Sequence, residues 1–317
     1  DREVLQTRKS VGVCDVTTLG KIDIQGRDAP AFLNSVYANA FGKLAVGKVR
    51  YGLMLREDGI AMDDGTTARL SEKRFVMTTT TANAVSVFRH LEFCRQCLWP
   101  GVDVHVISAT EQFAQYSVAG PNSRRLLGRL VDPEFDISNE AFPFMACAEI
   151  TVCGGTPARL FRISFSGELA YEIAVPARYG DALIRVLIAA GEPFDVVPYG
   201  TEALSVMRIE KGHPAGGELN GQTTAHDLGM GRLLSKSTDY IGNTLRQRPG
   251  LNFEDRPTLM GFRPVDRSEN LTAGAHIVAK GKEATMENDE GWISSVASSP
   301  TLKYSIGLGF IKRGSRR

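Results

Sequence analysis

The sequence lacks the features that mark membrane-spanning and nucleic-acid-binding proteins. No part of its 317 residues approaches the roughly 18 uninterrupted apolar residues that a membrane-spanning helix needs, since even residues 183–191 are interrupted by Arg185. Lys and Arg number 37 against 36 Asp and Glu, and a net charge of +1 gives no electrostatic reason to expect a nucleic acid or an anionic membrane as partner. The partner is therefore expected to be a small molecule or another protein.

Cysteine is scarce, and no secretory signal opens the chain. The five cysteines are an odd number in a large chain, which favours reduced thiols in the cytoplasm over a disulfide framework. The first residues do not form the charged and apolar regions of a signal peptide. Because the chain begins with Asp1 rather than Met, we expect a processed chain or a piece of a longer polypeptide.

Motifs for nucleotides, metals and acyl transfer are missing as well. No Gly-x-Gly-x-x-Gly segment follows a predicted strand, and no P-loop is present. Cys94 and Cys97 have the spacing of half a zinc site, but no second pair of Cys or His supplies the other ligands of a tetrahedral site. Ser166 lacks the flanking glycines of a nucleophile elbow. We therefore expect neither a metal site nor an acyl-enzyme.

The pattern of apolar residues predicts an α+β protein in which helices and strands do not alternate strictly. Short runs of alternating apolar and polar residues are typical of strands, and apolar residues three or four apart are typical of helices. Asp28 stands where its carboxylate can cap a helix. Strands are predicted at residues 21–25, 49–55, 60–70, 74–77, 158–164 and 169–175, and helices at residues 28–36, 83–98, 179–190 and 201–211 and from Pro121 onward.

A stretch rich in Pro and Gly and poor in apolar residues follows residue 246. It divides the chain into residues 1–246, expected to form two packed subdomains, and residues 247–317. The second part contains four short strand patterns and no helical pattern, so we expect it to form a small antiparallel β-barrel.

Two consecutive aspartates lie within a predicted strand, where charged residues are unusual. Asp63 and Asp64 interrupt a strand pattern that is otherwise apolar or rich in Thr, and an inward-facing Asp is costly unless something pairs with it. One of the two is expected to face a ligand, and a hairpin corner is an equally good alternative.

Glu172 lies within the strand predicted at residues 169–175, and its neighbours along that strand are apolar. Counting by twos places Glu168, Ala170 and Glu172 on one face of that strand. A carboxylate in an apolar pocket is suited to accept two parallel hydrogen bonds from adjacent N–H groups of a planar heterocycle. The alternative is a Glu172 that faces solvent.

Several segments together resemble a known family along nearly the whole chain. The sequence resembles the aminomethyltransferases (glycine-cleavage T-proteins) and, more closely, the C-terminal folate-binding region of the α subunit of heterotetrameric sarcosine oxidases. The resemblance implies an aminomethyltransferase-like α+β fold with mixed and antiparallel sheets. The segments that carry it are SVGVCDVTTLGK at 10–21, GKVRYGLML at 47–55, MDDG at 62–65, EAFP at 140–143, FRISFSGEL at 161–169 and YGTE at 199–202.

The resemblance implies tetrahydrofolate as cofactor and assigns roles to four residues. Tyr51, Asp64 and Glu172 occupy the folate-contacting positions of the family, with Asp64 as catalytic electrostatic partner and candidate general base and Glu172 as anchor of the pterin. Phe165 replaces an aromatic residue of the family and keeps a stacking or wall role without a hydroxyl group. No metal is required.

The implied activity is the formation of 5,10-methylenetetrahydrofolate from an iminium or formaldehyde that a partner flavin site produces. Flavin and NAD would then belong to other domains or subunits of the assembly, and the other sarcosine oxidase subunits would be the partners. Two alternatives stay open, namely a stand-alone folate-dependent aminomethyltransferase or demethylase and a non-catalytic scaffold with the folate-binding fold. The amine substrate and the oligomeric state do not follow from the sequence.

Three departures from the family pattern bear on the choice between these alternatives and on the affinity for folate. Leu204 stands where stand-alone aminomethyltransferases have an arginine near the folate, whereas the later Arg208 is kept, and this favours the oxidase subunit. Residues 213–217 and 231–232 replace bulkier apolar or aromatic residues, which predicts reduced affinity for folate.

Overall fold

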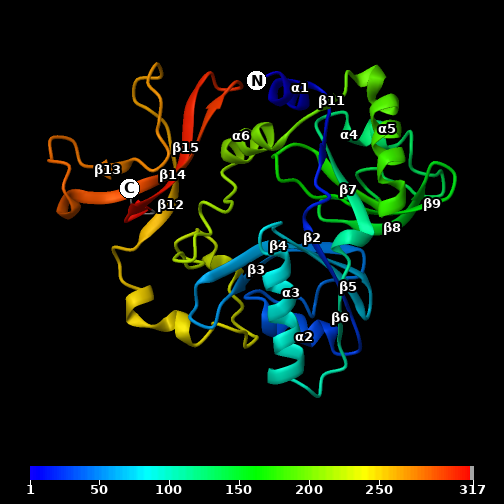
Figure 1. Ribbon diagram of the computed structural model, residues 1–317, viewed down its shortest axis with the longest axis horizontal. Coiled ribbons are helices and arrows are strands. Elements are labelled where there is room, and N and C mark those ends of the chain that lie inside the picture. Colours follow the sequence, from blue (N-terminus) through cyan, green and yellow to red (C-terminus); the bar gives the residue numbers. More distant parts are fainter. Residues whose placement is uncertain (315–317) are drawn as a thin grey trace.

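The computed structural model describes residues 1–314 and contains three β-sheets with helices packed on them. In Figure 1 the C-terminal sheet lies at the left, and the other two sheets lie one above the other at the right. The predicted α+β class with mixed and antiparallel sheets is confirmed.

The five-stranded sheet is antiparallel throughout and carries the Asp63-Asp64 segment on its second strand. Helices α2 (Ala29–Val36) and α3 (Ala84–Phe93) pack with it around a core that includes Phe32, Phe75 and Leu91. In sheet order, its strands are β3 (Lys48–Leu55), β4 (Ala61–Ser71), β5 (Arg74–Thr79), β2 (Gly20–Gln25) and β6 (His105–Ser108).

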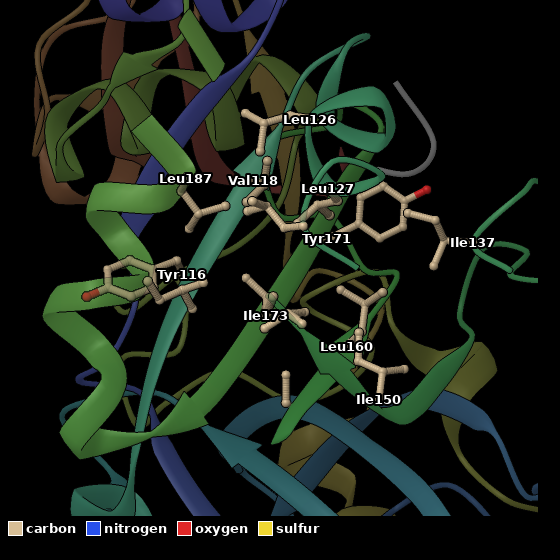
Figure 2. Close-up of a cluster of buried hydrophobic side chains, with 14 of the residues drawn as sticks. Tyr116, Val118, Leu126, Leu127, Ile137, Ile150, Leu160, Tyr171, Ile173 and Leu187 are labelled. Atoms are coloured by element: carbon tan, nitrogen blue, oxygen red, sulfur yellow. The ribbon is translucent and has the colours of Figure 1, made fainter. Parts of the chain in front are cut away.

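The six-stranded sheet is mixed, because β1 and β11 run parallel while the other neighbours are antiparallel. Helices α4 (Ser123–Leu127) and α5 (Gly180–Gly191) cover one face, where Leu126 and Leu187 meet Val118 and Ile173 (Figure 2). In sheet order, its strands are β11 (Val197–Pro198), β1 (Gly12–Asp15), β7 (Phe113–Ala119), β10 (Ala170–Pro176), β9 (Thr156–Phe161) and β8 (Cys147–Val152).

The predicted C-terminal barrel is wrong, because within the described residues this region forms an open four-stranded antiparallel sheet. Its order is β12 (Pro257–Phe262), β15 (Tyr304–Lys312), β14 (Asp289–Ser299) and β13 (His276–Val278), with β12 and β13 at the two edges. Closure is not needed to bury the apolar face, since helix α6 (Thr201–Lys211) packs against it through Ile209. The division after residue 246 stays a prediction, and residues 315–317 of the second part lie outside the described residues.

Local patterns located most other elements but missed several of their details. The helix at 201–211 has the predicted bounds, whereas the helix predicted at 83–98 continues beyond Phe93 as a π-helix, Cys94–Leu98. The carboxylate of Asp28 caps no helical amide and accepts a hydrogen bond from the Asp103 backbone N–H instead. Helix α1 (Arg2–Lys9) and strand β7 were not predicted.

Candidate functional site

Asp63 and Asp64 are both buried inside strand β4, so the alternative of a hairpin corner is wrong. Successive residues of a strand face opposite sides of its sheet, and the two carboxylates therefore have different surroundings. Asp63 accepts hydrogen bonds from the Thr80 hydroxyl at 2.6 Å and from Asn83 Nδ2 at 3.0 Å. Burial, the largest cause, raises the pKa of Asp63 to about 6. Asp63 thus links β4 to the start of α3, whereas the Asp64 side chain lies on the opposite face of the sheet.

Asp64 is held by Tyr51, whose hydroxyl donates a 2.7 Å hydrogen bond to Oδ2. The antiparallel register places Leu53 opposite Asp64, so Tyr51 stands two residues away on the neighbouring strand β3. Burial raises the pKa of Asp64, and the hydrogen bond from Tyr51 acts against that rise. Burial and the nearby Asp64 carboxylate also raise the pKa of Tyr51, so its hydroxyl remains a donor.

His213 joins Tyr51, Asp64 and Phe165 into one cluster. Its Nε2 lies 4.0 Å from Asp64 Oδ2, and its ring meets the Tyr51 ring edge-on with 5.7 Å between centroids. Phe165, on the connection between β9 and β10, contacts the imidazole with ring centroids 4.8 Å apart. Burial, followed by the charges of Lys211 and Arg208, lowers the pKa of His213 to about 4. The imidazole is therefore neutral at neutral pH.

In the sequence, His213 stands out as part of the departure from the family pattern at residues 213–217. The usable signal was its place directly after a helix and its capping glycine. Gly212 ends α6 in the left-handed region with φ of 78°, and the His213 N–H donates to the Arg208 carbonyl at 2.8 Å. The end of α6 thus fixes the backbone position from which the His213 side chain extends.

Glu172 lies in a separate buried polar group on strand β10. It is 9% exposed, so the solvent-facing alternative is wrong. Its Oε2 accepts a hydrogen bond from Gln115 Nε2. Burial raises the pKa of Glu172 to about 7, with Gln115 and the charge of Lys21 acting in the opposite direction. Gln115 and Lys21 were not singled out from the sequence.

Helix α6 carries both Arg208, which the family keeps, and the departure at Leu204, and the two side chains have distinct surroundings. Arg208 donates through Nη1 to Glu218 at 2.9 Å and through Nη2 to the Ser295 hydroxyl at 2.7 Å, so it anchors the C-terminal sheet. Leu204 packs against a cluster that includes Tyr199 and Met207. Leu204 therefore adds apolar surface to this cluster.

Within residues 1–314, no three His, Cys, Asp or Glu side chains come together as metal ligands. None of the helices described there combines the length and the apolar character needed to cross a membrane.

Comparison with known proteins places the chain in a family. The model of the GCVT N-terminal domain matches residues 1–238. The chain belongs to the GCVT family. The sarcosine oxidase α subunits of Rhizobium meliloti (strain 1021) and Corynebacterium sp. (strain P-1) are 53% and 45% identical to it over 319 aligned residues, which cover 100% of this chain and 32% and 33% of those proteins. This GCVT chain thus spans about a third of the length of those relatives.

Aminomethyltransferases are more distant but match over most of their own length. The enzyme from Geobacillus kaustophilus (strain HTA426) is 30% identical over 318 residues, which cover 98% of this chain and 81% of the relative. The crystal structure of aminomethyltransferase T of the glycine cleavage system from Bartonella henselae shares the fold, with a TM-score of 0.83 and 24% identity over 98% of this chain and 81% of that one. The resemblance to both groups is confirmed.

Proposed function

We propose that this chain is the tetrahydrofolate-binding, one-carbon-transferring part of a sarcosine oxidase α-like subunit. It would form 5,10-methylenetetrahydrofolate from an iminium or formaldehyde made at a partner flavin site. The observation that carries the proposal is the buried Asp64 carboxylate, which Tyr51 holds and which is close to His213. The identity of 53% over the whole chain to a sarcosine oxidase α subunit supports the assignment.

The side chains fit a reduced folate in the chemistry of their acceptors. Asp64 and Glu172 are buried carboxylates, and no Lys or Arg within residues 1–314 forms an ion pair with either of them. Such groups match the N–H groups of a pterin. When bound, tetrahydrofolate supplies the amine nitrogens that take up the carbon. Asp64 would stabilise positive charge that develops there and accept a proton, Glu172 would anchor the pterin, and Phe165 would form a wall.

The remaining parts of the proposal concern the assembly and its location. Flavin and NAD would be held by other domains or subunits, and the other sarcosine oxidase subunits would be partners of this chain. A cytoplasmic location is supported by five free cysteines, of which three are buried.

The test compares the wild-type chain with Asp64→Asn in an assembled oxidase and measures methylenetetrahydrofolate per sarcosine oxidised. The variant should lose at least about tenfold of this product while sarcosine oxidation continues, because only the folate-dependent step uses Asp64. Unchanged product formation by Asp64→Asn would overturn the catalytic role. Product formation without any oxidase partner would favour a stand-alone transferase, and a folded wild-type chain that binds no tetrahydrofolate would favour a scaffold.

A further inference from the structure

We propose that Arg8 is a positioning residue of the candidate folate site: it holds the turn at residues 164–168 and thereby sets where the Phe165 ring lies beside the ligand. The inference rests on the proposed function and adds a residue on helix α1 that acts on the ligand through Phe165.

Phe165 stands on a turn that belongs to neither of the neighbouring strands. Strand β9 ends at Phe161, and β10 begins at Ala170. The turn closes on itself through the Gly167 N–H, which donates to the Ser164 hydroxyl oxygen at 3.0 Å. These contacts fix the shape of the turn but not its direction, so the direction of the Phe165 ring depends on contacts with other elements.

The backbone carbonyls on either side of Phe165 each accept a hydrogen bond from a cation on another helix. Arg8 Nη1, on α1, donates to the Ser166 carbonyl at 2.8 Å, and Lys211 Nζ, on α6, donates to the Ser164 carbonyl at 2.6 Å. The Lys211 contact is exposed, whereas the Arg8 side chain is only 20% exposed and Ser166 is buried. A contact sheltered from water is the stronger one, so Arg8 is expected to contribute more than Lys211.

Arg8 is itself held by two carboxylates. Its Nη1 also donates to Glu168 Oε1 at 2.8 Å, and its Nε donates to Glu210 Oε2 at 3.1 Å. Glu210 lies on α6, and its other oxygen accepts a hydrogen bond from the Ser299 hydroxyl of β14 at 2.6 Å. Because the planar guanidinium presents five donors in a fixed geometry, one arginine can join the carbonyl and both carboxylates at once. The turn is thereby anchored to α1, α6 and the C-terminal sheet.

The turn places Phe165 against the His213 ring at the site. The two ring centroids are 4.8 Å apart, and His213 Nε2 lies 4.0 Å from Asp64 Oδ2. An aromatic wall stabilises a ligand only in close contact, since a gap of about 1 Å forfeits roughly half of the dispersion attraction. A small shift of the turn would therefore weaken this contact while Asp64 and Glu172 stay in place.

The experiment is a double-mutant cycle with the wild-type chain, Arg8→Lys, Phe165→Ala and the double variant, in which anaerobic calorimetry measures tetrahydrofolate affinity. Lys keeps the positive charge beside the carboxylates, but it lacks the planar group that joins them to the Ser166 carbonyl. Phe165→Ala should weaken binding by about tenfold and Arg8→Lys by about threefold to fivefold. In the Phe165→Ala background, Arg8→Lys should change the affinity by less than about twofold, because the ring that Arg8 positions is gone.

Stability supplies the contrast with a purely structural role. Urea unfolding should show the same loss of stability from Arg8→Lys with and without Phe165, whereas the loss of affinity should depend on Phe165. Arg95→Lys is the matched control, since Arg95 is a partly exposed arginine paired with Glu92 near the end of α3, and this variant should bind like the wild type.

The outcomes separate the two proposals. If Arg8→Lys is folded by circular dichroism and binds like the wild type, or weakens binding by the same factor with and without Phe165, the positioning role is overturned while the proposed function stands. If Phe165→Ala binds like the wild type, Phe165 is no part of the site and the positioning role fails with it. If the folded wild-type chain binds no tetrahydrofolate, the proposed function itself fails.

Discussion

Single carboxylates in this chain are buried at a cost to the stability of the folded state. Glu172 is the clearest case, because burial makes its charged form unfavourable and the hydrogen bond that it accepts from Gln115 comes from an uncharged donor. A side chain with this environment is retained at the expense of the folded state, as is common at ligand sites.

Glu172→Gln should weaken tetrahydrofolate binding by tens-fold, on the order of 2 kcal/mol, because a charged hydrogen bond to the ligand is lost. Calorimetry on the folded variant measures this. Glu140→Gln, at an exposed residue, is the control and should bind like the wild type. Equal affinities for wild type and Glu172→Gln would remove Glu172 from the site.

Glu172→Gln should also be more stable than the wild type at pH 8, because it lacks the buried carboxyl group that becomes charged as pH rises. The raised pKa of Glu172, about 7 against 4.5 when unfolded, means that the folded state binds more protons between these values, so wild-type stability falls as pH rises through this range. The stability difference, variant minus wild type, should therefore grow by on the order of 1–3 kcal/mol from pH 4.5 to 7. Urea unfolding at a series of pH values measures it, and a difference that stays flat across this range contradicts the burial of the charge.

At the scale of elements, the end of helix α6 connects the site to the C-terminal sheet. Gly212 places His213 on one side, while Arg208, one turn earlier, binds Glu218 and Ser295 on the other. Glu218 is fully buried and also accepts hydrogen bonds from the hydroxyls of Ser294 and Ser295.

Gly212→Ala should destabilise the chain by about 1 kcal/mol and weaken folate binding with it. A Cβ at Gly212 would meet no atom within 4 Å, so the cost comes from the positive φ alone. Gly101→Ala, which also meets no atom and has no positive φ, should cost less and leave binding unchanged. Chemical unfolding and calorimetry on both variants measure the effects, and equal behaviour of the two would contradict this role of the helix end.

How far the elements follow from sequence depends on how local their causes are. The helix at 201–211 and the pairing of β3 with β4 follow from apolar spacing and a short connection, and both were predictable. The open C-terminal sheet was not, because its apolar face is covered by Ile209 of α6, far away in the chain. The place of His213 beside Tyr51 and Phe165 was not predicted for the same reason, since three distant segments meet there. The family resemblance located Tyr51, Asp64, Phe165 and Glu172, whose roles remain predictions.

On the scale of the whole molecule, a buried charge network joins the two larger sheets. Asp23 on β2 accepts from Arg74 of its own sheet at 2.9 Å and from Arg159 on β9 of the six-stranded sheet at 3.3 Å. Arg159 also lies over the Phe113 ring. The network therefore fixes the position of one sheet relative to the other.

Asp23→Ala should cost on the order of 2 kcal/mol, because the buried Arg159 loses its charged hydrogen bond to Asp23 and keeps only the more exposed Glu149, 3.7 Å away. Folate binding should fall as well, although Asp23 is no predicted ligand contact, because Asp64 and Glu172 stand on the two sheets that it joins. Thermal unfolding and calorimetry measure these effects. Asp136→Ala, at a residue on an exposed turn, is the control. Normal binding by a destabilised Asp23→Ala would show that the sheets keep their arrangement without the network.

The division of the predicted contacts between two sheets also has a thermodynamic consequence. A ligand held by both Asp64 and Glu172 acts as a removable cross-link, since it binds only when the two sheets are in register. Tetrahydrofolate at about 100 times its Kd should then stabilise the folded chain by about 2.7 kcal/mol and raise its melting temperature. In this respect the supply of the cofactor would set the heat tolerance of the protein.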